Sequence, residues 1–374
     1  MFIKNAWYIA AWSHQITAQP LARTICNEPV VLYRDAAGGK AGALEDRCCH
    51  RGTPLSLGEV VPEGLQCGYH GLVFDSSGAC VHIPGQDNIP AKARVRSYPI
   101  VEKDEFIWIW MGDAAKADVS KIIDYPIHND YKKWPHKHAM YHVKGGAMLM
   151  VDNLMDLTHL GFVHKNTIGG NARAHVDAQM KVTPKDSGLH YIRWLLDSKP
   201  PPTYVKAAGF EGNVDRWQEF EYIAPGNIIQ WSGALAVGRG AQEKRDQEGG
   251  FQLRLFHGLT PETDTTCFYF WSTANGYRQD DPQATEILFS EIDRAFLEDK
   301  TIVEAQQAIL SRTGDGRLVD IVSDAARVHM RRTLDRLIAA EREASKRETA
   351  ALDSRTAAMP DARAAAALET RAAA

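Results

Sequence analysis

Residues 48–72 read CCHRGTPLSLGEVVPEGLQCGYHGL and contain two short clusters of cysteine and histidine. The first cluster contains Cys48 and His50, and the second contains Cys67 and His70. Each cluster supplies one thiol and one imidazole, and both groups bind metal ions. The glycines and prolines around them indicate two loops rather than one continuous helix or strand. The stretch therefore predicts a metal centre held between two loops.

Three interpretations of these clusters can be compared. A structural zinc site uses mixed cysteine and histidine ligands in a tetrahedral arrangement. A Rieske [2Fe–2S] centre uses two cysteines on one iron and two histidines on the other. The third interpretation is chance, because cysteine and histidine are common in protein cores. One thiolate and one imidazole from each of two loops favour the Rieske centre, and the glycines allow backbone N–H groups to approach its sulfides.

The length and composition of the chain exclude several classes of protein. Its 374 residues exceed what one hydrophobic core usually holds, so we expect two domains. The net charge of −4 argues against a nucleic-acid-binding protein. We expect no membrane span, because no run of about 18 apolar residues occurs. The first residues lack a secretory-signal pattern, and the 6 cysteines fit metal chemistry better than disulfides, so we expect a cytoplasmic protein.

The first 115 residues are predicted to form an all-β domain. Short β-branched or aromatic runs occur at 29–35, 42–48, 65–75 and 106–113, separated by glycine, proline, asparagine and aspartate. The strand pattern stops near residue 114, where a polar and helix-prone link begins. We therefore place a domain boundary between residues 115 and 116.

The second domain is predicted to span residues 116–345. Helices are expected at 150–164, 283–311 and 322–346. Strands are expected at 190–196, 216–223, 227–233, 251–259 and 267–274. Strands followed by a terminal helix indicate an α+β domain with an antiparallel sheet. Residues 346–374 are rich in alanine and contain no aromatic side chain, so we expect disorder or a fraying helix there.

A second candidate site lies in residues 150–164, MVDNLMDLTHLGFVH. His159 and His164 are separated by about 140° on an ideal helix, so their rings would share a face only after a bend. Gly161 lies between them and could permit that bend. Asp156 precedes His159 by three residues, where its carboxylate can reach the histidine on one helix face. Such a carboxylate commonly holds the second ring nitrogen of a metal-ligating histidine.

Polar side chains in this otherwise apolar helix support a metal site, although they could also serve as helix caps. A non-haem iron site that uses O2 needs two histidines and one carboxylate. The predicted helix near residues 291–307 offers acidic candidates for the third ligand. Chemistry alone does not choose among Glu291, Asp293, Glu298, Asp299 and Glu304.

These motifs resemble those of the Rieske non-haem iron aromatic oxygenases. The patterns CxHRGxPLSLG and LxCxYHGLxFD within residues 48–75, and NAWYIAAW at 5–12, are similar to that family. The resemblance covers about residues 1–340 and is strongest to the branch of vanillate O-demethylase and dicamba O-demethylase. It departs at Cys49, where the family usually has proline. We expect Cys49 to fill a small apolar space, or to be an oxidation-sensitive thiol.

The resemblance implies roles for individual residues. The ligands of the Rieske [2Fe–2S] cluster would be Cys48, His50, Cys67 and His70. The ligands of a mononuclear non-haem Fe(II) would be His159, His164 and Asp299. Asp299 is chosen because LEDKTIVEAQQ at 297–307 resembles the ED-x-x-x-x-E-x-Q stretch of the family. Asn153 would lie close to this iron.

The resemblance also implies an assembly and an electron path. The chain would form a homotrimer, or a hexamer built on trimers, in which each second domain has the helix-grip fold. A separate reductase with a flavin and a [2Fe–2S] centre would deliver electrons from NADH or NADPH. Each electron would pass from the cluster of one subunit to the iron of its neighbour. Asp156 would bridge them, contacting His159 in its own chain and His70 of the next chain.

The reaction implied is oxidation of a small aromatic acid by O2, with O-demethylation of a methoxybenzoate-like substrate as the main prediction. Hydroxylation or dihydroxylation of a phthalate-like or sulfonated aromatic is the alternative. A Rieske electron-transfer protein is the non-enzyme alternative, which the second histidine pair disfavours. The pocket should be apolar with few polar groups. The substrate contacts predicted on the sheet are Gln230, Trp231, His257 and Asn275. His257 could bind a carboxylate, or could be a hydrogen-bonded core histidine.

Overall fold

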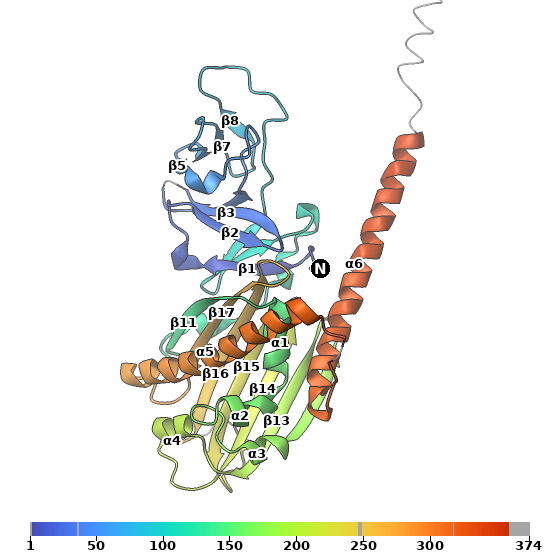
Figure 1. The fold of residues 1–374 in the computed structure, drawn as a ribbon. Coiled ribbons are helices and arrows are strands. Elements are labelled where there is room, and N and C mark those ends of the chain that lie inside the picture. The colour runs from blue at the N-terminus through green and yellow to red at the C-terminus, as the bar shows by residue number, and fades with distance from the viewer. Residues whose placement is uncertain (1, 36, 246–248, 317, 359–374) are drawn as a thin grey trace, which may run out of the picture.

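The computed structural model describes residues 2–35, 37–245, 249–316 and 318–358. A smaller β domain at the amino-terminal end rests against a larger domain that contains one wide sheet and several helices (Figure 1). This arrangement confirms the predicted α+β fold, in which an all-β domain comes first.

The amino-terminal domain contains three small antiparallel sheets. The first has the order β1 (Trp7–Trp12), β10 (Phe106–Trp110), β9 (Ile100–Lys103). The second has the order β2 (Leu21–Ile25), β3 (Glu28–Arg34), β4 (Ala41–Glu45). The third has the order β5 (Glu59–Val61), β6 (Gly64–Gln66), β7 (Val73–Phe74), β8 (Cys80–His82). The single strand predicted at 65–75 is therefore two strands, because the chain reverses between them at Gly71, whose φ is 72°.

The larger domain is built on a seven-stranded antiparallel sheet with the order β11-β17-β16-β15-β14-β13-β12. Its strands are β11 (His136–Val143), β12 (Gln179–Lys185), β13 (Gly188–Ser198), β14 (Val214–Ile223), β15 (Asn227–Ala236), β16 (Phe251–Pro261) and β17 (Cys267–Asn275). The five predicted strands correspond to β13 to β17. Successive side chains of a strand point to opposite faces. We call the face that carries Gln218 and Leu255 the inner face, and the other the outer face.

Helices cover the inner face. They are α1 (Ala147–Met155), α2 (Leu160–Val163), α3 (Ala172–Val176), α4 (Pro202–Ala208), α5 (Pro282–Thr313) and α6 (Ala325–Ala358). Figure 1 shows α1 and α5 lying across the sheet, and the largest hydrophobic core fills the space between these layers. The helix predicted at 150–164 is interrupted: α1 ends at Met155, and a 3-10 turn over Leu157–His159 precedes α2.

The outer face of the sheet contacts the amino-terminal domain through β16 and β17. Aromatic side chains from both domains form one buried cluster that includes Trp12, Trp108 and Phe256. A Cβ atom at Gly258 would lie 2.4 Å from Ile9 Cδ1, so this position requires glycine for the close approach of β1. These contacts hold the two domains in one orientation.

The last helix extends well past its predicted end. Helix α6 continues to Ala358, so the part of the tail between residues 346 and 358 is helical rather than disordered. The Glu341 carboxylate of α6 accepts hydrogen bonds from the backbone N–H groups of Lys4 and Asn5. The remainder of the predicted tail, residues 359–374, lies outside the described residues. No helix in the described part of the chain is long and apolar enough to cross a membrane.

Candidate metal centres and substrate pocket

The two cysteine–histidine loops have nearly the same backbone geometry. The N–H of Cys48 donates to the carbonyl of Thr53, and the N–H of Cys67 donates to the carbonyl of Leu72, five residues later in both loops. In each loop a glycine four residues after the cysteine donates its N–H to the cysteine carbonyl, with φ near 72°. The loops therefore present their side chains as a matched pair.

The side chains of these loops are placed as a Rieske centre requires. Cys48 and Cys67 are buried at 3% and 1% exposure, whereas His50 and His70 are exposed. The rings of His50 and His70 lie 4.6 Å apart between centroids. Burial, together with the neighbouring Cys67, raises the pKa of the Cys48 thiol to about 11, so the Cys48 sulfur needs a metal to become a thiolate. Two buried sulfurs below two exposed imidazoles fit a cluster whose histidine end faces solvent.

Cys49 does not have the environment that we expected. It is exposed, so its side chain does not fill an apolar space in the core. The role of an oxidation-sensitive thiol remains a prediction.

The second histidine pair lies directly after the interruption of the helix at the end of α1. Asp156 has extended backbone angles of φ −121° and ψ 99°, which end α1 and reorient the chain before His159. Gly161 lies inside α2, and its missing Cβ allows close packing against Ala172, whose Cα would be 2.3 Å away. The break at Asp156 precedes both histidines, so it is not the bend predicted between them, and Gly161 lies within helical backbone. The rings of His159 and His164 lie 5.2 Å apart between centroids.

Both histidines direct the same ring nitrogen at one carboxylate. The Nε2 atoms of His159 and His164 lie 3.4 Å and 3.0 Å from Asp299 Oδ1. Asp299, on α5, is 4% exposed. Burial opposes ionisation of Asp299, but its contacts with the two histidines outweigh burial and lower its pKa. Among the acidic candidates on α5, the structure thus brings Asp299 to the histidine pair.

Hydrogen bonds at the other ring nitrogens hold both histidines in place. The Nδ1 of His159 lies 2.5 Å from the backbone carbonyl oxygen of Asp156, and the Nδ1 of His164 lies 2.7 Å from Glu298 Oε2. Both partners are acceptors, so each Nδ1 carries the proton and each Nε2 has its lone pair free for a metal. This set of two imidazoles and one carboxylate fits a non-haem iron site with open positions.

Asp156 and Asn153 lie at this site, but one predicted contact differs. Asp156 does contact His159, yet through its backbone carbonyl, because its carboxylate accepts from the N–H and hydroxyl groups of Thr158. Asn153 donates from Nδ2 to Asp299 Oδ1 at 3.0 Å, and its Oδ1 is buried without a hydrogen-bond partner among the residues described. Asn153 therefore lies against the candidate iron site, as predicted.

A cavity lies between the candidate iron site and the inner face of the sheet. Leucine, isoleucine and phenylalanine provide most of its wall. Its lining residues are Asn153, Leu154, Leu157, His159, Leu160, His164, Ile168, Tyr204, Gln218, Phe220, Gln230, Ser232, Leu253, Leu255, Ile292, Phe296 and Asp299. A mostly apolar pocket with few polar groups suits a small aromatic molecule.

Of the predicted substrate contacts on the sheet, Gln230 lines this cavity. Trp231 is the next residue on β15 and lies on the outer face, where its ring packs under Arg254 at 3.9 Å. Asn275 is on the inner face, but its side chain is fully buried and bonded to the Tyr277 carbonyl and the Thr285 hydroxyl. Strand alternation explains the first error, and a structural hydrogen-bond pair explains the second.

His257 lies on the inner face but behind the wall of the cavity. It has no exposed surface, and its ring nitrogens lie 2.7 Å from the Tyr269 hydroxyl and 2.9 Å from Gln230 Oε1. Burial lowers the pKa of His257 to about 3, so the ring is neutral. His257 is therefore a hydrogen-bonded core histidine that orients Gln230. Its ring is neutral and lies behind the cavity wall, so it does not offer a cation to a substrate carboxylate.

Two cavity residues, Gln218 and Ser232, were missed by the sequence analysis. They are polar residues that lie directly opposite each other on β14 and β15. Gln230 precedes Ser232 by two residues and therefore shares its face. This spacing was a signal that could have identified Ser232 once Gln230 was chosen.

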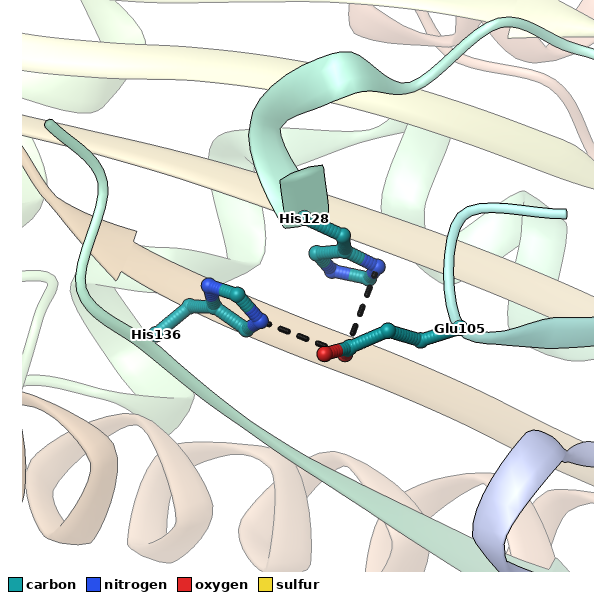
Figure 2. Close-up of side chains that lie close together, drawn as sticks. All are labelled: Glu105, His128 and His136. Carbon is teal, nitrogen blue, oxygen red and sulfur yellow. Dashed lines mark hydrogen bonds and ion pairs between the residues drawn. The ribbon is translucent and has the colours of Figure 1, made fainter. Parts of the chain in front are cut away.

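A second group of potential metal-binding residues lies at the junction of the two domains. Figure 2 shows His128 and His136 directed at Glu105, which directly precedes β10 of the amino-terminal domain. The His136 Nε2 lies 3.2 Å from Glu105 Oε2. Both nitrogens of His128 already have protein partners, the Asp104 carbonyl at 2.9 Å and the Ser272 hydroxyl at 2.8 Å. We therefore describe this group as an ion-pair network that joins the domains.

Comparison with known proteins agrees with this geometry. Residues 6–99 match the Rieske [2Fe-2S] domain, and residues 143–340, more than half of the chain, match the vanillate O-demethylase oxygenase C-terminal domain. The iron-sulfur subunit TsaM1 of a toluene-4-sulfonate monooxygenase system from Comamonas testosteroni is 42% identical over 343 residues, which cover 91% of this chain and 98% of that protein.

Two further comparisons cover nearly the whole chain. The vanillate O-demethylase oxygenase subunit of Pseudomonas sp. (strain HR199) is 36% identical over 365 residues, covering 96% of this chain and 100% of that protein. The crystal structure of dicamba monooxygenase bound to dicamba matches with a TM-score of 0.82 at 33% identity, covering 92% of this chain and 99% of that one. The chain therefore belongs to the Rieske non-haem iron oxygenases, as an oxygenase component of the vanillate O-demethylase family, with a Rieske [2Fe–2S] cluster and a mononuclear iron as its cofactors.

Proposed function

We propose that this oxygenase oxidises a small aromatic acid, and that O-demethylation of a methoxybenzoate-like compound is its reaction. The observation that carries the proposal is the position of His159, His164 and Asp299 at one end of an apolar cavity. The wall of that cavity is mostly apolar, as a pocket for an aromatic ring is. The vanillate and dicamba relatives, by their names, are O-demethylases, which supports the same reaction class.

We assign the iron ligands to the residues that the loops and helices bring together. Cys48, His50, Cys67 and His70 would hold the cluster. His159, His164 and Asp299 would hold the mononuclear iron, which when bound supplies oxidation of a substrate C–H bond by O2. The protein's own groups do the positioning: Asp156 and Glu298 hold the Nδ1 protons of the two histidines, and Asn153 holds Asp299. Leucine and phenylalanine side chains exclude water from the cavity.

We further propose that electrons pass between subunits of a homotrimer, or of a hexamer built on trimers. The sheet β5–β8, which carries the cysteine–histidine loops, and α2, near the second histidine pair, lie at opposite ends of one chain (Figure 1). His70 is exposed beside Tyr69, and Phe162 of α2 is 66% exposed. Exposed apolar side chains next to both sites support docking of one chain on another. Asp156 would then bridge His159 and the neighbouring His70.

The proposed partner is a reductase with a flavin and a plant-type [2Fe–2S] centre, which draws electrons from NADH or NADPH. Supplied with such a reductase, the iron-loaded protein should consume O2 with 4-methoxybenzoate and release formaldehyde and a phenol. Replacement of the third ligand, Asp299→Ala, should abolish this coupled consumption while the cluster keeps its visible absorbance. Product formation by that variant would reject the assigned iron site.

A second reaction has specific support. The relative from Comamonas testosteroni is part of a toluene-4-sulfonate monooxygenase system, so hydroxylation of a sulfonated aromatic by the same site is the alternative proposal. The two reactions differ in products. Formaldehyde appears when a methoxy group is lost, whereas oxidation of toluene-4-sulfonate leaves all its carbon atoms in one product. Parallel assays with these substrates, followed by liquid chromatography, would therefore separate the two.

A further inference from the structure

A row of side chains crosses the inner face of the sheet opposite the candidate iron site. The antiparallel register aligns Arg193 of β13, Gln218 of β14, Ser232 of β15 and Leu253 of β16. Gln218, Ser232 and Leu253 line the substrate cavity, and Gln230 lies next to Ser232 on the same face. The polar side chains of this wall, Gln218, Ser232 and Gln230, therefore adjoin one another.

The hydrogen bonds around Gln218 leave only its donor group facing the cavity. Gln218 Oε1 accepts a hydrogen bond from the Arg193 guanidinium at 3.4 Å. An amide whose oxygen points toward Arg193 must point its NH2 group the other way. Within the part of the chain that the structure describes, no protein acceptor binds Gln218 Nε2. Gln218 therefore offers N–H donors to whatever fills the cavity.

Gln230 and Ser232 also direct donor groups at the cavity. His257 stands 2.9 Å from Gln230 Oε1, and because its Nδ1 is the acceptor for the Tyr269 hydroxyl, its Nε2–H is the donor to Gln230. Gln230 Nε2 then donates to Ser232 Oγ at 2.7 Å. The Ser232 hydroxyl receives this bond, so its own proton is available to a ligand, together with the second N–H of Gln230. Three neighbouring side chains thus offer N–H or O–H donors to the cavity, and each of their oxygens already accepts one hydrogen bond.

Two buried positive charges stand behind this donor wall. Arg193 and Arg216 are 2% and 1% exposed, and neither forms a direct ion pair within the part of the chain that the structure describes, although the Asp156 carboxylate acts on Arg193 from farther away. Arg193 donates to the His175 carbonyl, and Arg216 donates to two loop carbonyls while its Nε has no partner. The Arg216 guanidinium also lies 4.9 Å above the ring of Tyr204, a cavity residue. A buried charge without a counter-ion is costly, so an anion nearby is favoured.

Resting on the proposed function, we propose that the oxyacid group of the aromatic substrate, a carboxylate or a sulfonate, binds to Gln218, Ser232 and Gln230, and that Arg193 and Arg216 provide the compensating positive charge. An oxyacid group has only acceptor atoms and so matches a wall of donors. The substrate ring would then lie among the leucines of the cavity, with its opposite end toward His159, His164 and Asp299. This arrangement makes Gln218 a specificity-determining residue.

The test compares acids with neutral analogues by calorimetric titration of the iron-loaded protein. The probes are 4-methoxybenzoate against 4-methoxybenzamide, and toluene-4-sulfonate against toluene-4-sulfonamide. We expect the wild-type protein to bind each acid about tenfold or more tightly than its amide, as for a charge-assisted hydrogen bond. The pair with the larger ratio identifies the oxyacid that the site prefers.

The decisive variant is Gln218→Glu, which keeps the shape of the side chain, removes its donors and supplies a counter-ion to Arg193. It should weaken binding of the acids by about 10- to 100-fold and change binding of the amides by less than about threefold. The matched control is Gln179→Glu on the exposed end of the same sheet, which should leave all four affinities unchanged. A second variant, Ser232→Ala, removes one donor and should weaken acid binding by about three- to tenfold.

Equal losses for acids and amides in both variants, or no preference for acids in the wild-type protein, would overturn this inference. Titration requires no turnover, so its outcome is independent of the proposed reaction. Selective binding without coupled O2 consumption would reject the proposed function alone. Coupled oxidation of the acids and amides with equal affinity would reject the donor wall alone.

Discussion

The ring of His164 is held between two consecutive residues of α5: its Nδ1 lies 2.7 Å from Glu298 Oε2, and its Nε2 lies 3.0 Å from Asp299 Oδ1. One turn of helix thus supplies both the partner that fixes the imidazole and the carboxylate that would share its metal. Burial opposes protonation of His164, but its contacts with Asp299 and Glu298 outweigh burial and raise its pKa. The His164–Glu298 pair therefore sets which nitrogen is presented to iron.

Replacement of Glu298 by alanine should weaken iron binding at the mononuclear site by about 10- to 100-fold, as for other partners of ligating histidines. The Nδ1 proton of His164 would lose its acceptor, and the ring would lose its orientation. Iron retained after dialysis against a chelator measures the effect. The control is Glu286→Gln, an exposed residue of the same helix. Unchanged iron retention in Glu298→Ala would show that Thr167 and burial suffice to hold the ring.

The side chain of Asp156 has a separate test, because its backbone carbonyl, and not its carboxylate, holds His159. In Asp156→Asn the carbonyl remains, and the amide oxygen can still accept from the N–H of Thr158. We therefore expect normal iron content together with a large loss of coupled O2 consumption, since the proposed bridge to the next subunit needs the carboxylate. Iron analysis and oxygen-electrode assays measure the two effects. Full activity in Asp156→Asn would remove this residue from the electron path.

Both candidate metal centres could be proposed from the sequence because most of their candidate ligands occur in short motifs. The spacing of Cys48, His50, Cys67 and His70 depends on local turns, which glycine and proline encode directly. Asp299 required the resemblance to a family, since α5 has several acidic residues and the contact with His164 depends on tertiary packing. The substrate wall was predicted less well. Trp231 and Gln230 are adjacent in sequence, and only the register of β15 with β14 shows that they occupy opposite faces.

The hydrogen bonds of buried polar groups were also beyond sequence reasoning. His257 was expected on the inner face and lies there, but its two partners come from β15 and β17, which are distant in sequence. Helix α6 was expected to end near residue 346, because alanine-rich segments bury little apolar surface. In the structure α6 is tied to the body through polar contacts, including an ion pair between Lys116 and Glu348.

Helix α6 is joined to the helix that carries Asn153 by the ion pair of Arg331 with Asp152. The Arg331 guanidinium donates to both carboxylate oxygens, and the Asp152 side chain is 14% exposed. A two-point pair in partly buried surroundings contributes more than a surface ion pair, so Arg331→Ala should lower the free energy of unfolding by about 1–3 kcal/mol.

Urea denaturation followed by circular dichroism would measure this change. The matched control is Arg332→Ala, the exposed neighbour on the same helix, for which we expect a change within about 0.5 kcal/mol. Lysine at position 331 keeps the charge but cannot make two parallel hydrogen bonds, so Arg331→Lys should recover only part of the loss. Equal stability of the Arg331→Ala and Arg332→Ala variants would show that α6 is not held by this pair.

The junction of the two domains should be sensitive to pH through Glu105 and His136. Burial opposes protonation of His136, but its hydrogen bonds to Glu105 and to the Trp134 carbonyl outweigh burial and raise its pKa. The hydrogen bond from His136 lowers the pKa of Glu105. His128 and His138 also face Glu105, at 3.8 Å and 3.7 Å, but burial lowers the pKa of each to about 4, so both are neutral above pH 5.

A raised pKa of His136 means that the folded state binds its proton more tightly than the unfolded state. The stabilisation is therefore fully present below the unfolded pKa of about 6.5 and is lost as pH rises through the higher folded value. Glu105→Gln should lower the melting temperature at pH 6 and have little effect at pH 9. The corresponding loss in free energy of unfolding should stay below about 1 kcal/mol, because Glu105 is partly exposed. Glu63→Gln, at an exposed site in the same domain, should show no such pH dependence. A larger loss at pH 9 than at pH 6 would contradict the assigned ion pair.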